Sequence, residues 1–199
     1  VSGFLGKPLP EKALADLAFE VEKIHHGTPS GIDNTVVAYQ KPIFFVKEKP
    51  PEFLQISQPT HWIIADTGER TPTLETVTAV RALNNEDPVF YGEIFEKIGK
   101  LALSARGALE KGDIPVLGNL MNENQALLSE LNVSNPKLES LINAARSAGA
   151  EGAKLSGGGR GGNIIALSKP DHITRIEDAL KQAGAVRVIK TILSGHGEV

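Results

Sequence analysis

Glycine occupies five of the six positions from 157 to 162, and Arg160 is the single interruption. Because glycine has no Cβ atom, such a stretch can turn sharply and bring its backbone N–H groups close to an anion. The cluster lies between the apolar segments 153–156 and 163–168, so it predicts a loop that joins two strands. It is not a Walker A loop, since no Gly-Lys-Ser/Thr follows and the next segment reads as a strand. A tight hairpin turn needs only one or two glycines, and we therefore favour a ligand-facing loop to which Arg160 adds a guanidinium suited to phosphate.

The segments around this loop predict an α+β fold. Residues 61–65 (HWIIA) read as a buried strand. From residue 153 onward the pattern indicates two strands, a helix that contains Ile173, Ile176 and Leu180, and a final strand in VRVIKTIL. This order gives a β-α-β-β-α-β series, which is a ferredoxin-like split β-α-β arrangement with extra helices.

Four helices are predicted between residues 66 and 152. A polar loop with Thr67, Arg70 and Thr71 comes first, and Thr73 is expected to be the N-cap of a helix over 74–83. The other helices are one over 94–109 that ends at Gly112, one capped by Asp113, and one that opens at Asn135-Pro136 and ends at Gly149.

The N-terminal part has a different pattern. Residues 10–25 predict an amphipathic helix that Gly27 and Pro29 terminate. TVVAY (35–39) and IFFV (43–46) then predict a β-hairpin, with Gln40-Lys41-Pro42 as its turn.

Composition excludes several classes of function. The 199 residues carry 21 Lys and Arg against 24 Asp and Glu, a net charge of −3, which argues against binding to nucleic acid. The absence of cysteine excludes disulfides, thiolate zinc sites and a cysteine nucleophile. The apolar runs are too short to span a membrane and no leader-like segment opens the chain, so we expect a soluble, cytoplasmic protein with no membrane partner.

Two carboxylates are the candidates for acid–base and metal chemistry. Glu22 lies near the end of the first predicted helix, and Asp33 follows a Gly-Thr-Pro-Ser-Gly reversal that can fold the chain back toward it. One carboxylate can bind Mg²⁺, and the other can accept a hydroxyl proton. A solvated helix residue for Glu22 and a turn or capping residue for Asp33 remain the alternatives. His25 and His26 are adjacent on the predicted helix and make a poor chelating pair, so a wall of a substrate pocket or a solvated helix end is favoured over zinc.

Two motifs resemble those of mevalonate kinases, which are members of the GHMP kinase superfamily. Residues 26–34 (HGTPSGIDN) are similar to that family's HG-x-PSG-x-DN signature. Residues 154–162 (KLSGGGRGG) resemble the superfamily's C-terminal glycine-rich motif, although Arg160 interrupts the glycines and Asn163 stands where Cys is common. Residues 65–73 (ADTGERTPT) are similar to the segment between the two motifs.

The resemblance implies ATP-dependent phosphorylation of the primary alcohol of mevalonate to phosphomevalonate, a step of isoprenoid biosynthesis. It implies that Asp33 is the catalytic carboxylate, that Glu22 is the Mg²⁺ ligand, and that His26, Ser30 and Thr73 bind the substrate. ATP and Mg²⁺ are the implied cofactors, mevalonate is the implied small-molecule partner, and a homodimer is left open. The residues that would border the nucleotide phosphates are Gly157, Gly158, Gly159, Arg160, Gly161 and Gly162.

The resemblance also divides the chain. Residues 1–58 would be the remainder of the GHMP N-terminal domain, with a helix, the loop of the catalytic Asp and the hairpin, and residues 59–199 would be the C-terminal domain. The family's N-terminal Lys and its P-x-x-x-G-L-x-S-S-A phosphate loop do not occur in these residues. We therefore expect the larger, C-terminal part of such a phosphotransferase, inactive by itself. Another GHMP-type small-molecule kinase and a non-catalytic GHMP-fold binding module are the alternatives.

Overall fold

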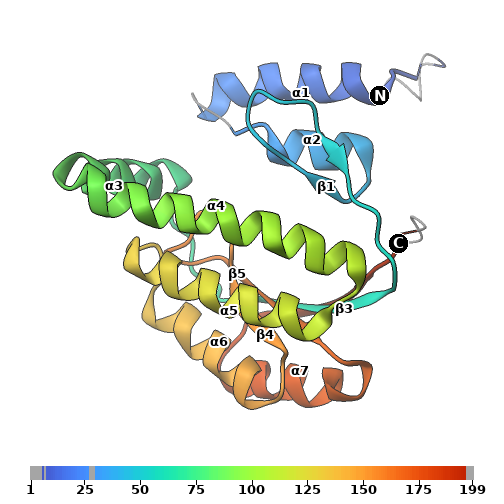
Figure 1. Cartoon of the computed structure of the whole chain (residues 1–199), viewed down its shortest axis with the longest axis vertical. Coiled ribbons are helices and arrows are strands. Elements are labelled where there is room, and N and C mark those ends of the chain that lie inside the picture. Colours follow the sequence, from blue (N-terminus) through green and yellow to red (C-terminus); the bar gives the residue numbers. More distant parts are fainter. Residues whose placement is uncertain (1–5, 7, 27–29, 196–199) are drawn as a thin grey trace. The chain divides into compact units, whose positions relative to one another are not determined.

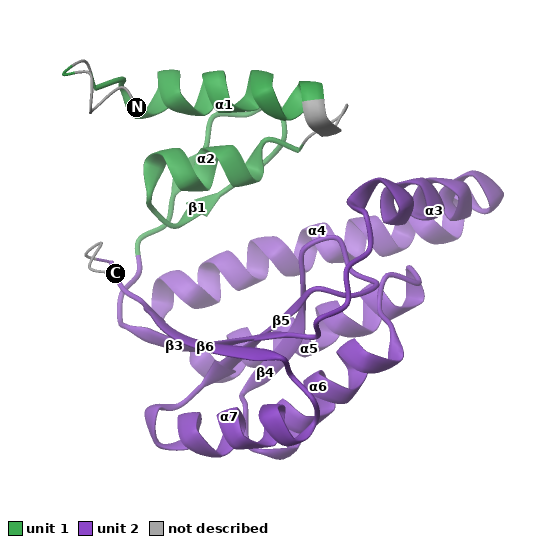
Figure 2. Cartoon of the chain, turned by 180° about the vertical axis from the view of Figure 1, so that it is seen from behind, with its two compact units in different colours: residues 1–55 green, residues 56–199 purple. Residues whose placement is uncertain are grey.

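The computed structural model describes residue 6, residues 8–26 and residues 30–195; the side chains of His25 and His26 lie outside the described part. The chain forms two compact units, residues 1–55 and residues 56–199 (Figure 2). Each unit has its own helices and sheet. The assignment of residues 1–58 and 59–199 to two domains of one kinase fold stays a prediction.

The first unit is built on two helices. α1 (Glu11–His26) confirms the predicted N-terminal helix, and it packs on α2 (Ile32–Tyr39). Asn34 Nδ2 on α2 donates to the carbonyl oxygen of Ala15 on α1 at 3.0 Å. β1 (Ile43–Phe44) and β2 (Glu52–Phe53) form a short antiparallel pair.

The hairpin predicted from TVVAY and IFFV is wrong, because the first of these runs is helix α2. Its β-branched residues favour a strand, but that preference is weak and tertiary packing overrides it. Gly31, in the left-handed conformation, starts the helix. Thr35 Oγ1 donates to the carbonyl oxygen of Gly31 at 2.6 Å, and Thr35 and Ala38 are buried. Asp33 therefore lies in the first turn of a helix and not in a loop.

The second unit contains a four-stranded antiparallel sheet in the order β4-β5-β3-β6. Its strands are β3 (Thr60–Asp66), β4 (Gly152–Ser156), β5 (Asn163–Ser168) and β6 (Arg187–Leu193). β3 is central and pairs with β5 on one side and β6 on the other. This is the strand order of a ferredoxin-like β-α-β-β-α-β fold, so the predicted α+β class is confirmed.

Four helices connect β3 to β4 where a ferredoxin-like unit needs one, and a fifth precedes β6 (Figure 1). Asp113 Oδ1 and Asn135 Oδ1 accept from N–H groups in the first turns of their helices, as predicted. Gly112 ends the long α4 in the left-handed conformation. The elements are α3 (Thr73–Glu86), α4 (Pro88–Lys111), α5 (Ile114–Glu130), α6 (Pro136–Ser147), the 3-10 turn η1 (Pro170–His172) and α7 (Ile173–Gln182).

The prediction that Thr73 caps α3 is wrong. Thr73 is the first helical residue, and the cap position is Pro72, which makes no side-chain cap hydrogen bond. Pro72 has an extended backbone, which suits a cap position, and a proline ring offers no side-chain acceptor. The Thr73 hydroxyl is therefore not used for capping.

Alternating residues of the sheet divide between two apolar clusters. Ile63 and Ala65 of β3 pack in the larger cluster with residues of β4, β5, α6 and α7. Trp62 of β3 and Leu167 of β5 pack in a smaller cluster with α4 and α5. Because β4 and β5 are fixed by these clusters, both ends of the loop that joins them are held by the core.

Candidate functional site

The glycine-rich loop connects β4 to β5 with a backbone that few residues other than glycine can adopt. Gly157, Gly159, Gly161 and Gly162 all have positive φ, and so does Arg160 at 56°. A Cβ atom on Gly159 would collide with the carbonyl oxygen of Val133, and one on Gly161 would lie 2.9 Å from the carbonyl oxygen of Glu69. The sequence cluster is thus explained by conformation and by close backbone approach on two sides.

On one side the loop is bound to the turn that follows β3. The backbone N and the hydroxyl of Thr67, a fully buried residue, both donate to the carbonyl oxygen of Gly162, at 2.9 and 2.8 Å. Gly162 N in turn donates to the carbonyl oxygen of Glu69 at 2.8 Å, and Thr71 Oγ1 donates to the carbonyl oxygen of Arg160 at 2.7 Å. The polar loop seen in the sequence therefore supports the glycine loop.

On the other side the loop is bound to the connection between α5 and α6. Arg160 N donates to the carbonyl oxygen of Val133 at 2.7 Å, and Arg160 Nε donates to the carbonyl oxygen of Asn132 at 3.0 Å. The guanidinium of Arg160 is therefore tied to the protein backbone through Nε. Its predicted contact with phosphate stays a prediction.

Four N–H groups of the loop make no hydrogen bond to the described residues; Gly157 and Gly158 are exposed, while Gly159 and Gly161 are buried. None of the described residues accepts a hydrogen bond from the backbone N of Gly157, Gly158, Gly159 or Gly161. A Cβ atom on Gly157 would meet nothing within 4 Å, and one on Gly158 would lie 3.4 Å from Thr73 Oγ1. The loop thus offers backbone donors next to a hydroxyl at the start of the 14-residue helix α3, where the helix dipole favours an anion.

Thr76 adds an unusual feature one turn further along α3. It is only 3% exposed, and its Oγ1 has no hydrogen-bond partner within the described part of the chain. Sequence reasoning gave this residue no role, because a threonine inside a helix carries no local signal.

Lys154 lies on β4, three residues before the loop begins. Its Nζ donates to the carbonyl oxygen of Leu155 at 2.6 Å, and burial lowers the pKa of the Lys154 ammonium from 10.5 to about 8. The sequence analysis assigned no role to this side chain, although a lysine within a strand that leads into the core is a detectable signal.

The remaining predicted site residues belong to the first unit. Glu22 is half-buried near the end of α1, and Asp33 is exposed in the first turn of α2. Ser30 is exposed, and its Oγ accepts from Ile32 N at 3.3 Å. The side chain of His26 lies outside the described residues. Within the part of the chain that is described, no three His, Asp or Glu side chains gather as a metal-binding cluster.

The predicted residues thus fall into two sets. The structure brings Thr73 beside Gly158 in the second unit, while Glu22, Ser30 and Asp33 are placed within the first unit.

Comparison with known proteins gives a consistent result. Residues 105–186 match the family model described as GHMP kinases C terminal. The chain is 36% identical to the mevalonate kinase of Pyrococcus horikoshii over 199 residues, which cover 96% of this chain and 58% of that protein. It is also 36% identical to the mevalonate kinase of Aeropyrum pernix, over 87% of this chain and 54% of that protein.

Solved structures agree with the sequence relatives. The mevalonate kinase of L. major, in complex with R-mevalonate, has a TM-score of 0.87 and 32% identity, and the match covers 94% of this chain and 59% of that one. The Methanococcus jannaschii mevalonate kinase has a TM-score of 0.81 and 27% identity, over 98% of this chain and 59% of that one. The chain therefore spans somewhat more than half the length of the proteins it matches.

Proposed function

Through residues 105–186 the chain belongs to the GHMP kinase C-terminal domain family, and from this premise we propose that it forms part of an ATP-dependent mevalonate kinase. The reaction would transfer the γ-phosphoryl group of ATP to the primary alcohol of mevalonate and give phosphomevalonate, for isoprenoid biosynthesis. Its relatives over most of the chain are mevalonate kinases.

The glycine loop is the observation that carries this proposal. Phosphoryl transfer depends on positioned donors that stabilise the negative charge of the phosphates. The N–H groups of Gly157, Gly158, Gly159 and Gly161 have no partner among the described residues. Those of the exposed Gly157 and Gly158 are donors of this kind, held by a backbone that is already bonded to the protein on both sides. A loop that only connected two strands would not need four uncommitted donors.

The other residues would act on the acceptor and on the metal. Thr73 Oγ1 can donate to an oxygen of the bound substrates, since it is not used for capping. Asp33 would accept the proton of the mevalonate hydroxyl, and Ser30 and His26 would contact the substrate. Mevalonate carries a carboxylate and two hydroxyls, which suit such polar side chains.

Magnesium fits the donor set on chemical grounds. Glu22 and Asp33 supply carboxylate oxygens, the ligands that Mg²⁺ takes in small numbers alongside water and substrate phosphates. When bound, the ion would neutralise charge on the phosphates. We assign Glu22 to it and leave the acceptor proton to Asp33.

The proposed setting is the cytoplasm. Among the described helices, none combines the length and the apolar character needed to cross a membrane.

The test is a coupled assay of ADP release with the full-length protein as its gene encodes it. Mevalonate should support turnover with Mg²⁺ and ATP, and phosphomevalonate and galactose should not. Turnover with phosphomevalonate or a sugar in place of mevalonate would favour another GHMP-type kinase, and no turnover with any acceptor would favour the non-catalytic binding module.

A further inference from the structure

A buried polar cluster lies behind the glycine loop, with Gln125 at its centre. Gln125 is on α5 and is 2% exposed. Its Nε2 donates to Glu139 Oε1 at 2.8 Å and to Ser134 Oγ at 3.2 Å, and its Oε1 accepts from Leu155 N at 2.9 Å. The three hydrogen bonds of its side chain thus reach α6, the α5–α6 connection and β4.

The first route from Gln125 to the loop runs through the strand that enters it. β4 is an edge strand, so the N–H groups on its free side have no neighbouring strand. Gln125 Oε1 takes the N–H of Leu155, two residues before Gly157. Further from the loop, Asn122 Oδ1 accepts from Ala153 N at 3.1 Å, so a second N–H group on the free edge of β4 has a side-chain acceptor.

The second route runs through the connection between α5 and α6. Ser134 Oγ donates to Glu139 Oε1 at 2.6 Å and accepts from Gln125. The residue before it, Val133, is buried, and its carbonyl oxygen accepts from Arg160 N at the tip of the loop. Gln125 is therefore connected both to the start of the loop and to the segment on which its tip rests.

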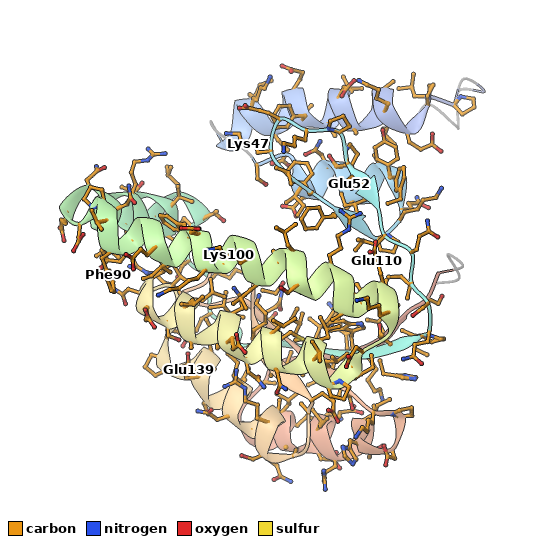
Figure 3. All side chains as sticks on the ribbon, in the orientation of Figure 1. Lys47, Glu52, Phe90, Lys100, Glu110 and Glu139 are labelled. Atoms are coloured by element: carbon orange, nitrogen blue, oxygen red, sulfur yellow. The ribbon has the colours of Figure 1, made fainter. Side chains whose placement is uncertain are left out.

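Glu139 is the charged member of the cluster, and its carboxylate accepts hydrogen bonds from the other side chains. This residue, labelled in Figure 3, lies on α6 and reaches α5. Burial by itself would raise the pKa of Glu139, but hydrogen bonds from Ser134, Gln125 and Ser129, with the charge of Arg146, lower it. The charged acceptor makes each of these bonds stronger than a neutral pair.

We propose that Gln125 is a positioning residue for the glycine loop: it fixes the loop backbone at its start and at its tip without touching a ligand. Its effect on phosphate binding rests on the proposed function, while its effect on the loop backbone does not. A side chain that served only the core would stabilise the fold evenly and leave the loop as it is in the wild type.

The experiment measures amide hydrogen exchange and ATP affinity in the full-length protein. Gln125→Met keeps the side-chain volume and removes the bonds. Ser129→Ala is the matched control, because its hydroxyl donates to Glu139 Oε1 and to the backbone carbonyl oxygen of Gln125 but lies on neither route to the loop. Asn122→Ala is the control for stability, because it removes a half-buried hydrogen bond to the same strand further from the loop.

The informative amide is Arg160 N, which Gln125 does not contact. We expect Gln125→Met to speed its exchange about tenfold more than that of the Ile63 and Ala65 amides in β3, the loss that one buried hydrogen bond produces. ATP with Mg²⁺ should bind about tenfold more weakly, and neither control should show the selective change. Equal acceleration in β3 and at Arg160, or the same pattern in Ser129→Ala, would overturn the proposal.

A second variant keeps the test valid if Gln125→Met does not fold. Ser134→Ala breaks the second route alone, and Ser134→Thr restores the hydroxyl. Faster exchange at Arg160 in the first and recovery in the second are expected; unchanged exchange in Ser134→Ala would contradict the account. If the wild-type protein bound no ATP, the proposed function would fail, and the exchange of Arg160 N would still decide the role of Gln125.

Discussion

The glycine loop and the segment around Asp33 differ in how their backbones are held. The loop is bonded to two neighbouring segments, and its ends lie in strands fixed by the core. In the first unit the buried side chains among the described residues are Ala15, Thr35 and Ala38. Large apolar side chains there, such as Val37 and Ile24, are 72% and 81% exposed.

Under the proposed function, this difference predicts two kinds of contribution to the reaction. In the second unit, the backbone geometry of the proposed phosphate site is set by folding, so substitutions in the loop should change stability and binding together. In the first unit, the exposed carboxylate Asp33 supports little of the fold, so its substitution should change chemistry alone.

The largest effect is expected at Asp33. In the full-length protein, Asp33→Asn should lower turnover by about 10²- to 10⁴-fold, which is the usual contribution of a positioned proton acceptor. The melting temperature should stay close to that of the wild type, because the side chain is exposed. Asp16→Asn, another exposed aspartate of the first unit, is the control. Wild-type turnover in Asp33→Asn would remove the residue from the mechanism.

Glycine substitutions test the loop. Gly157→Ala should cost about 1 kcal/mol of unfolding free energy, because its positive φ disfavours a side chain but the space is open. Gly159→Ala should cost several times more, on the order of 3 kcal/mol, because its Cβ also collides with the carbonyl oxygen of Val133.

Chemical denaturation of both glycine variants measures their unfolding free energies, and titration with ATP measures their affinity for the nucleotide. Equal costs at Gly157 and Gly159 would mean that the contact with Val133 does not constrain the loop.

A smaller effect is expected at Glu22. Glu22→Gln keeps the shape of the side chain and removes the charge that Mg²⁺ requires, so the Mg²⁺ concentration for half-maximal turnover should rise severalfold. The melting temperature should change by a few degrees at most. A Mg²⁺ titration identical to that of the wild type would return Glu22 to an ordinary helix residue.

The last effect is on stability alone and concerns the pH dependence at Lys154. Its pKa is about 8 in the folded chain and 10.5 ordinarily, so between these values the unfolded chain binds a proton that the folded chain does not. The contribution of Lys154 to the free energy of unfolding therefore rises as pH increases from about 8 to 10.5. Below pH 8 the ammonium is charged and buried in the folded chain, and this lowers the free energy of unfolding.

Lys154→Met removes that cost. At pH 7 the variant should be more stable than the wild type by at most about 3.5 kcal/mol, since one pKa unit corresponds to about 1.4 kcal/mol. The advantage should shrink as pH rises toward 10. Denaturant unfolding at several pH values measures it, with Lys97→Met, at an exposed position of α4, as the control. A constant difference across this range would contradict the burial of the ammonium.

Local signals predicted much of the second unit. The caps Asp113 and Asn135 and the β-β-α-β order after residue 152 each depend on residues near one another in sequence. The same approach was wrong for residues 35–39, where β-branched residues form a helix because Thr35 and Ala38 are buried. It was also wrong for Thr73, whose neighbour Pro72 takes the cap position.

The supports of the loop could not be predicted in this way. Gln125 lies on the buried side of α5 among apolar residues, and its partners come from β4, α6 and the connection between the helices. Gln125 pairs with Leu155, and Val133 pairs with Arg160. No spacing in the sequence indicates either pair, because both form only when the sheet and the helices pack together. The glycine cluster indicated that a loop was special, and the structure identifies what holds it.

The response of the loop amides to ATP tests most directly whether the glycine loop is a phosphate site. Backbone N–H signals of the full-length protein, followed by NMR during titration with ATP and Mg²⁺, should shift most at Gly157, Gly158, Gly159 and Gly161. The signals of Arg160 and Gly162, whose N–H groups already donate to protein carbonyls, should move less. Saturable binding of ATP that left the four glycine signals unchanged would contradict the assignment of this loop as a phosphate site.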